Sequence, residues 1–360
     1  MEKSSALFNP DFSSDRANLK VMAMKNFFYG LLFPLSICWM TCNGQAEFGG
    51  QHLKLERTIE LSGVSGRIDH LTLNAAKNML YIAAYGNNSI EVIDLSSGKL
   101  KSSIKGLQHP QGISYIPGSH VIVVSNADHG LLTFYDEQTF KSKRKLDLGD
   151  DADNIRYLPE RKTVFVGYGS GAIAIIDETS QKIRGKIQLE GHPESFQVDP
   201  TSGKIWVNVP DANLIEVLDG NHMKVLAKWK QQKYSSNFPM AYDHVGKQLF
   251  VVFRHPSRLV VLDSETGEEI AVLKCTGDAD DIFYDSRSKR ILVTSGAGYI
   301  DIFQEKDRSY KLITHLASAA GARTSLWDPN HNELFVAVPK RLGHPAELSV
   351  YKMIEPNTNH

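Results

Sequence analysis

The chain has 360 residues, of which 42% are hydrophobic and 22% are charged. It can therefore bury a large core, and it is neither a disordered nor a fibrous sequence. The 40 Lys and Arg residues nearly balance the 41 Asp and Glu residues, which argues against a surface that coats nucleic acid or an acidic membrane. Three cysteines exclude a disulfide-stapled scaffold.

The first 46 residues have the features of an upstream segment followed by a secretory signal. Lys25 gives a short basic start, and the apolar run 27–40 follows it. This run is shorter than the about 20 residues that a helix needs to span a membrane. Gly44-Gln45-Ala46 places small residues where a signal peptidase requires them, so we expect cleavage after Ala46.

These features predict an exported protein that is periplasmic or extracellular, with no transmembrane helix in the mature chain. An uncleaved membrane anchor is one alternative. A lipoprotein attached through Cys42 is another, but Trp39-Met40-Thr41 is a poor match to the sequence that precedes a lipidated cysteine.

A repeat occupies the rest of the chain. Strand-like segments recur about every 40 residues, and most of them end in Asp. The segments are IEVID (90–94), LTFYD (132–136), IAIID (173–177), IEVLD (215–219), LVVLD (259–263), IDIFQ (300–304) and LSVYK (348–352). Two further β-branched runs precede each one, separated by Gly, Asn, Asp and Pro, which are strand and turn signals. Seven such units predict an all-β fold, a seven-bladed β-propeller.

The ends of the repeat predict how the ring closes. The seventh unit ends at LSVYKMI with no fourth strand after it, whereas Leu53–Leu61 is a strand without a hairpin partner. We expect this N-terminal strand to complete the last blade, which removes an exposed edge. Residues 1–46 would then be the upstream segment with the signal peptide, and residues 47–360 a single propeller domain. A β-helix or other solenoid is the alternative, and the orphan strand argues against it.

The second run of each unit carries variants of a Tyr/Phe-Val-x-x pattern. Examples are Tyr81-Ile82-Ala83-Ala84, Phe165-Val166-Gly167-Tyr168 and Phe335-Val336-Ala337-Val338. With the Gly/Asn turns that follow and the third strands that end in an IDL-like tripeptide, the chain resembles the YVTN-type, YncE-like propellers of exported bacterial proteins over about residues 51–355. The resemblance implies the fold and export but no particular activity. A WD40 propeller is disfavoured, because Trp327-Asp328 follows a first strand instead of ending a third.

Candidate site residues come from two adjacent columns of the blade alignment, at the start of each first strand. One column reads Asp69, Gln111, Asp153, Glu194, Phe238, Asp280 and Arg323, and the next reads His70, Gly112, Asn154, Ser195, Pro239, Asp281 and Thr324. First strands line the central channel of a propeller, so these residues should converge at the mouth of the channel. Polar and charged residues are unusual at the start of buried strands, and their recurrence here indicates a binding site. The predicted ligand-binding residues are Asp69, His70, Gln111, Asp153, Asn154, Glu194, Asp280, Asp281 and Arg323.

Carboxylates gathered this closely need a partner to stay ionised. The partner is a divalent cation, a cationic or polyhydroxy ligand, or Arg323 together with channel water in a plug that only ties the blades together. Oxygen-rich sites favour Ca²⁺ or Mg²⁺, whereas nearby His70, His109 and His192 would admit a transition metal.

The sequence therefore predicts a monomeric exported binding protein that recognises a small ligand, a metal ion or a protein partner at its channel mouth. The alternative is a metal-assisted enzyme, similar in plan to propeller lyases and lactonases. Glu194, Asp153 or His70 would then transfer protons, and Arg323 would stabilise developing negative charge. Nucleic-acid binding is a third interpretation, against which the near-neutral charge argues.

Overall fold

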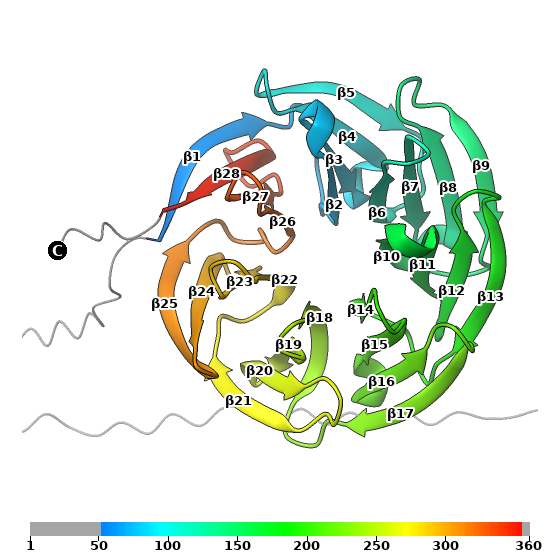
Figure 1. The fold of residues 1–360 in the computed structure, drawn as a ribbon. Coiled ribbons are helices and arrows are strands. Elements are labelled where there is room, and N and C mark those ends of the chain that lie inside the picture. Colours follow the sequence, from blue (N-terminus) through cyan, green and yellow to red (C-terminus); the bar gives the residue numbers. More distant parts are fainter. Residues whose placement is uncertain (1–51, 355–360) are drawn as a thin grey trace, which may run out of the picture. The chain divides into compact units, whose positions relative to one another are not determined.

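The computed structural model describes residues 52–354, in which strands form seven four-stranded antiparallel sheets. Figure 1 shows these sheets as the blades of a ring around a central channel. The chain is thus an all-β, seven-bladed propeller, as the repeat predicts. The expected signal segment and its cleavage site lie outside the described residues. No helix among residues 52–354 has the length and apolarity needed to cross a membrane.

The blades follow the sequence, and each runs from the channel outward. Blade 1 comprises β2 (Leu71–Asn74), β3 (Met79–Ala84), β4 (Ser89–Asp94) and β5 (Lys99–Lys105). Blade 2 comprises β6 (Pro110–Ile116), β7 (Val121–Asn126), β8 (Leu131–Asp136) and β9 (Ser142–Asp147). Blade 3 comprises β10 (Ala152–Leu158), β11 (Thr163–Tyr168), β12 (Ala172–Asp177) and β13 (Lys182–Gln188). Blade 4 comprises β14 (Phe196–Val198), β15 (Lys204–Val209), β16 (Leu214–Asp219) and β17 (Lys224–Lys230). Blade 5 comprises β18 (Ser235–Asp243), β19 (Gln248–His255), β20 (Ser257–Asp263) and β21 (Glu269–Lys274).

Blade 6 comprises β22 (Ala279–Asp285), β23 (Arg290–Ser295), β24 (Tyr299–Lys306) and β25 (Ser309–Ala317). Blade 7 comprises β26 (Ser325–Asp328), β27 (Glu333–Val338), β28 (Glu347–Met353) and, from the other end of the chain, β1 (Leu53–Glu60). Short 3-10 turns occur at η1 (Ala75–Lys77), η2 (Tyr85–Asn87), η3 (Asp128–Gly130), η4 (Pro159–Arg161) and η5 (Pro210–Ala212).

The N-terminal strand closes the ring, which confirms the prediction. β1 pairs antiparallel with β28 from Leu53 opposite Met353 to Glu60 opposite Glu347, and Figure 1 shows the blue β1 outside the red β28. The pairing of β1 skips one residue between Leu55 and Arg57. The third and fourth strands of the other six blades show the same irregularity, so β1 has the geometry of a fourth strand as well as its position.

The repeated Asp at the end of the third strands stabilises the turn to the fourth. Asp94 Oδ1 accepts hydrogen bonds from the backbone N–H groups of Ser96 and Ser97 at 2.9 and 3.2 Å. Side-chain bonds of this kind favour Asp in turns, and Asp136, Asp177, Asp219 and Asp263 make them too. The pattern departs at Gln304 and at Lys352, and no turn to a fourth strand follows Lys352 because the fourth strand of blade 7 comes from the N-terminus.

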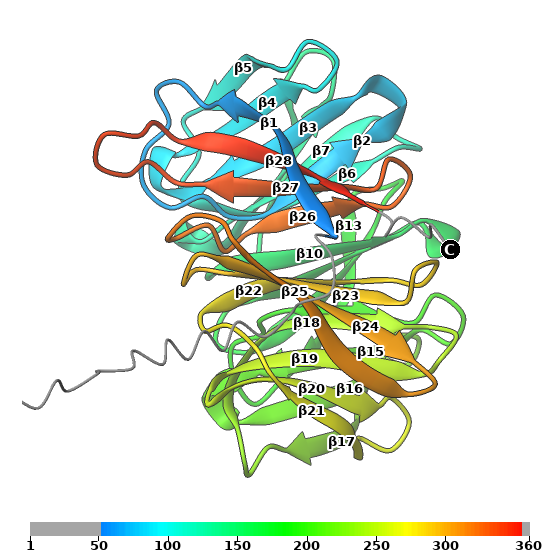
Figure 2. The ribbon, with the colours of Figure 1, turned by 90° about the vertical axis from the view of Figure 1, so that its left-hand side faces the viewer.

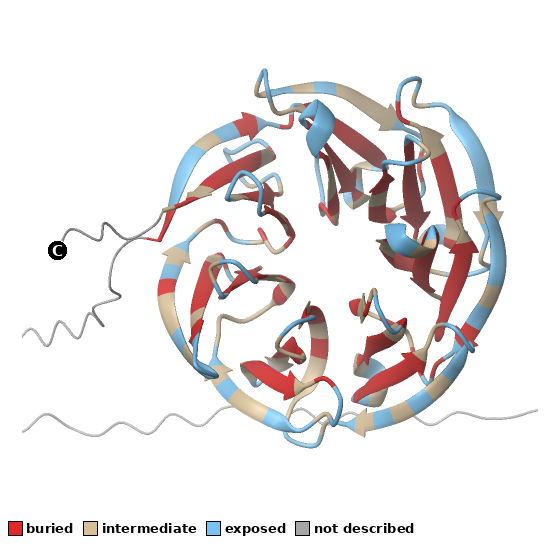
Figure 3. Ribbon diagram, in the orientation of Figure 1, coloured by how far each residue is buried: buried red, intermediate tan, exposed pale blue. Residues whose placement is uncertain are grey.

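The core lies between the blades. Figure 3 shows the inner strands of each blade as mostly buried and the outermost strands as largely exposed. Phe165 of β11, for example, belongs to one apolar cluster with Phe196 of β14 and Val207 of β15, in the next blade. A single blade would leave both of its faces exposed, so the repeats stabilise one another only as a ring.

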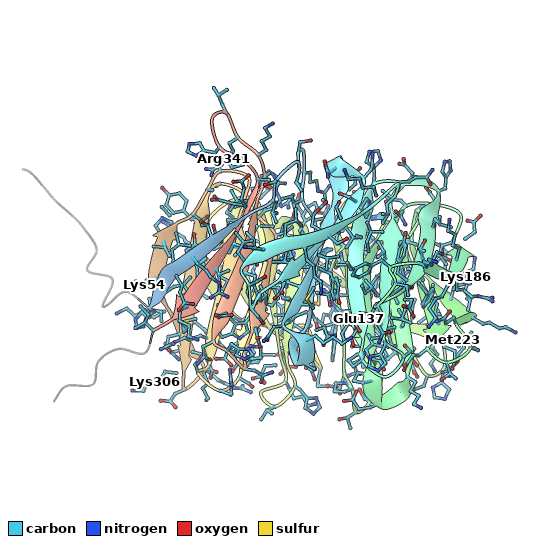
Figure 4. The ribbon with its side chains drawn as sticks, turned by 90° about the horizontal axis from the view of Figure 1, so that it is seen from above. Lys54, Glu137, Lys186, Met223, Lys306 and Arg341 are labelled. Atoms are coloured by element: carbon cyan, nitrogen blue, oxygen red, sulfur yellow. The ribbon has the colours of Figure 1, made fainter. Side chains whose placement is uncertain are left out.

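The two faces of the ring are made by different loops (Figures 2 and 4). In Figure 4, Arg341 projects from the loop between the second and third strands of blade 7, and Lys306 ends the third strand of blade 6 on the opposite face. First strands begin on the face of Arg341. We call this end of the channel the mouth and the other end the far end.

Candidate functional site

A β-bulge at the start of the first strands brings consecutive residues into the channel. Asp69 N–H donates to the carbonyl oxygen of Ala83 at 2.7 Å, and Ala83 N–H donates to that of His70 at 2.9 Å, so two residues oppose one. In blades 3 and 6, the pairing of the first strand with the second strand is interrupted at the equivalent place. Neighbouring residues of a regular strand face opposite sides, but a bulge re-aims them. Residues of both predicted columns therefore line the channel.

The nine predicted residues lie in three adjoining spaces along the channel. The mouth cavity, of about 320 Å³, is lined by Gln111, Asp153, Glu194, Asp280 and Arg323. A narrow polar layer of about 20 Å³ below it contains Asp69, His70 and Asn154, together with Asp153, Glu194 and Asp280. The far cavity, of about 410 Å³, is lined by Asp281 and again by His70. The structure thus brings all nine into the channel, and their role in binding stays a prediction.

Three arginines neutralise part of the acidic cluster. Arg67 Nη2 lies 2.6 Å from Asp69 Oδ2, and Arg254 Nη2 donates to Asp280 Oδ1 at 2.6 Å. Arg323, which the sequence suggests as the counter-charge of the whole cluster, pairs with Asp278 at 2.8 Å. Of the predicted carboxylates at the mouth, Asp153 and Glu194 have no arginine within 4.0 Å among the described residues.

Sequence reasoning missed Arg67, Arg254 and Asp278 as members of the mouth. A signal for two of them exists, because Arg67 and Asp278 each stand two residues before a residue of the first predicted column, in the segment that leads into the first strand. Arg254 has no such signal. It lies near the end of a second strand, β19, and its guanidinium stacks on Phe238, with the central carbon 3.7 Å from the ring centroid.

Asp153, His192 and Glu194 form a group with metal-ligand geometry. One ligand atom from each lies within 4.8 Å of the others. His192 Nε2 is 4.0 Å from Asp153 Oδ2, whereas Nδ1 on the other side of the ring is 2.6 Å from the carbonyl oxygen of Gly169. A carbonyl can only accept, so Nδ1 carries a proton, and Nε2 is the nitrogen that faces the carboxylates and can bind a metal ion once it has lost its own proton. Metal-binding histidines are typically oriented in this way.

Asp153 is poorly satisfied for a buried carboxylate. The residue is 7% exposed, and its Oδ1 accepts no hydrogen bond among residues 52–354. The nearest recorded group is His70 Nε2 at 4.0 Å, which is too long for a hydrogen bond. Buried carboxylates of this kind usually have a bound partner.

Burial controls the charges of the three groups. It raises the pKa of Glu194 to about 8, with help from the charges of Asp153 and Asp280. Burial would also lower the pKa of His192, but Asp153 and the Gly169 carbonyl outweigh it and raise this pKa to about 9. The pKa of Asp153 is lowered in spite of its burial, because His192 and His70 face it. Without a ligand, His192 is therefore cationic, Asp153 anionic and Glu194 neutral at pH 7.

The remaining acids of the channel are also strongly perturbed. Burial raises the pKa of Asp69 to about 7, although Arg67 opposes the shift. It raises the pKa values of Asp280 and Asp281 to about 6, against the attraction of Arg254 and of His70 respectively. Carboxylic acids that retain protons near pH 7 are typical of binding and active sites.

No family model matches the chain. Among solved structures it is similar to a chain in the crystal structure of the mitotic checkpoint complex, with a TM-score of 0.72 and 14% sequence identity over 94% of this chain and 100% of that chain. At this identity the likeness concerns the fold alone. The protein is thus a seven-bladed β-propeller, a class whose members carry many unrelated functions. Its assignment to the YVTN-type family stays a prediction.

Proposed function

We propose that this protein is an exported propeller that binds one divalent transition-metal ion at its channel mouth, through Asp153, the Nε2 atom of His192 and Glu194. The observation that carries the proposal is the approach of these three ligand atoms to within 4.8 Å of one another, around a histidine whose other nitrogen is fixed by a backbone carbonyl.

The distances suit a small metal ion. Zinc binds nitrogen and carboxylate oxygen at about 2.0–2.2 Å, so ligands of one ion stand roughly 3.0–3.5 Å apart. To bind one ion, the Asp153 and Glu194 side chains would have to rotate so that their oxygen atoms move closer to His192 Nε2. An imidazole ligand favours Zn²⁺, Fe²⁺, Ni²⁺ or Cu²⁺ over Ca²⁺ and Mg²⁺, which prefer oxygen alone.

The charge of the site supports the same ion. Carboxylates outnumber arginines at the mouth, and the unliganded site compensates by holding protons on His192 and Glu194. A divalent ion replaces these two protons without changing the net charge. Three protein ligands leave further coordination positions open to the mouth cavity of about 320 Å³, where a small molecule can join the ion.

The test is calorimetric titration of the chelator-treated mature protein with Zn²⁺, Mn²⁺, Ca²⁺ and Mg²⁺. We expect one Zn²⁺ ion per chain and at least about tenfold weaker binding in Asp153→Asn, His192→Ala and Glu194→Gln. His222→Ala is the matched control, since this histidine lies on an exposed turn beside Asp219.

Unchanged Zn²⁺ affinity in His192→Ala, or tighter binding of Ca²⁺ than of Zn²⁺, would contradict the proposal. The lyase- or lactonase-like alternative uses the same residues. If the protein showed metal-dependent turnover of a substrate, and Glu194→Gln abolished this turnover, the result would favour the enzyme over a protein that only binds the ion.

A further inference from the structure

The far cavity has a different chemistry from the mouth. Its volume of about 410 Å³ is in the usual range for small-molecule sites. The later parts of the first strands supply most of its wall, with Met240, Phe283, Leu326 and Trp327 among the apolar side chains. Two charged groups, Arg156 and Asp281, line the same cavity.

Arg156 is a cation without an ion pair. Among residues 52–354, no carboxylate oxygen lies within 4.0 Å of its guanidinium. Its recorded hydrogen bonds run from Nη1 to the carbonyl oxygen of Ile155 at 2.9 Å and from Nη2 to Ser195 Oγ at 3.1 Å. A guanidinium has five N–H donors, so three N–H bonds have no partner in the described part of the chain. Burial lowers the pKa of Arg156, and the charges of Asp281 and Asp153 offset this only in part.

Asp281 is the complementary anion. Its Oδ2 accepts a hydrogen bond from the backbone N–H of Ser325 at 2.7 Å. Its Oδ1 accepts none among the described residues, and the nearest recorded group is His70 Nδ1 at 3.8 Å. Asp281 therefore has one carboxylate oxygen available to a donor in the cavity. Arg156 and Asp281 perturb each other's pKa, which places them in one electrostatic environment.

A ligand that satisfies both groups carries an anion and a hydrogen-bonding cation, with an apolar remainder. The α-amino acids have this composition. A carboxylate can accept two parallel N–H bonds from a guanidinium, and an ammonium group donates to a carboxylate oxygen. The apolar wall then suits a large aliphatic or aromatic side chain.

We propose that the far cavity binds a free α-amino acid with a large apolar side chain, its carboxylate on Arg156, its ammonium on Asp281 and its side chain against Phe283, Leu326 and Trp327. This site lies at the opposite end of the channel from the proposed metal, and the inference does not depend on the metal.

The experiment is calorimetry of the mature protein with L-phenylalanine and three analogues, each lacking one recognised part. 3-Phenylpropionate lacks the ammonium, phenethylamine lacks the carboxylate, and glycine lacks the side chain. We expect L-phenylalanine to bind with one site per chain and each analogue at least about tenfold more weakly. Equal binding of L-phenylalanine and 3-phenylpropionate, or no binding of L-phenylalanine at millimolar concentration, would overturn the proposal.

Variants locate the site. Arg156→Gln and Asp281→Asn should each weaken L-phenylalanine binding at least about tenfold while leaving Zn²⁺ binding within about twofold of the parent. Circular dichroism and thermal denaturation check that these variants fold, independently of any metal. Arg144→Gln, on the exposed strand β9, is the control and should bind like the parent. Unchanged affinity in folded Arg156→Gln would refute the assignment, and the analogue series on the unaltered protein tests it even if both variants fail to fold.

Discussion

The carbonyl oxygen of Gly169 lies 2.6 Å from Nδ1 of His192 and so connects two blades. Gly169 belongs to the turn between β11 and β12 in blade 3, and His192 leads into β14 of blade 4. The sequence Gly167-Tyr168-Gly169-Ser170-Gly171 superficially resembles a phosphate loop, but it joins two strands. Its glycines let the chain of the next blade pass closely, and one of its carbonyl groups sets the orientation of the histidine.

Substitutions in this turn should separate backbone strain from crowding. Gly169 has φ of +64°, and an added Cβ would make only an ordinary van der Waals contact with Asp150 Cβ at 3.8 Å, so Gly169→Ala should cost about 1–2 kcal/mol of stability. At Gly171, with φ of +149°, an added Cβ would stand 2.8 Å from the carbonyl oxygen of Gly191 and displace the segment that carries His192. We expect Gly171→Ala to lose more stability and also to weaken Zn²⁺ binding. Chemical denaturation and calorimetry check both; a Zn²⁺ affinity unchanged in Gly171→Ala would count against the role of this turn.

Metal binding should strengthen as the pH rises. The pKa of His192 is raised to about 9 and that of Glu194 to about 8, so at pH 6–8 the ion must displace a proton from each. The Zn²⁺ affinity should therefore rise by up to about 100-fold per pH unit at the lower end of this range. Calorimetry in buffers of different ionisation enthalpy counts the released protons. Glu194→Gln should release about one proton fewer, and a flat affinity between pH 6 and 8 would exclude these ligands.

Asp280→Asn should make the metal-free protein more stable at alkaline pH. The folded-state pKa of Asp280 is raised from 3.8 to about 6, mainly by burial. The folded protein thus holds this proton more tightly than the unfolded chain, and the resulting stability is complete below pH 4 and lost as the pH rises through 6. The variant stays neutral, so it should match the parent at pH 4 and exceed it by about 1–3 kcal/mol at pH 8. Urea denaturation at both pH values measures the difference, and lower stability of the variant at pH 8 would contradict the burial argument.

The closing strand should carry much of the stability of blade 7. Ile59 is 2% exposed and packs in the cluster between blades 7 and 1, whereas Leu55 on the same strand is 46% exposed. Ile59→Ala should cost about 2–5 kcal/mol, and Leu55→Ala, the matched control, less than about 1 kcal/mol. Deletion of residues 47–62 should expose the edge of β28 and cause aggregation. A deletion variant that melts like the parent would rule out this role for β1.

Export is tested by the mass of the purified protein. The apolar run 27–40 and the small residues before Glu47 predict a mature chain that starts near Glu47. Recovery of the full-length chain from the cytoplasm would be the contrary result.

The sequence alone predicts the fold well, because the features that define it are local and repeated. The Asp at the end of five of the seven third-strand segments, the spacing of about 40 residues and the orphan strand Leu53–Leu61 all have direct structural counterparts. The predicted completion of the last blade by the N-terminal strand is also confirmed, since β1 pairs with β28.

The site was predictable only in part. Alignment of the blades identifies Asp153 and Glu194, since equivalent positions of a ring converge on its axis. The bulge at Asp69 and His70 is not evident in the sequence, and a regular strand would have sent one of the two away from the channel. The contact of Arg254 with Asp280 joins a second strand to the first strand of the next blade, and no periodicity within one unit encodes it.

The most direct test of the proposed metal site is anomalous diffraction from a crystal of the mature protein soaked in Zn²⁺. We predict a single strong peak at the channel mouth, within about 2.3 Å of a carboxylate oxygen of Asp153, Nε2 of His192 and a carboxylate oxygen of Glu194. A channel without an ordered peak, or a peak ligated by other residues, would contradict the account.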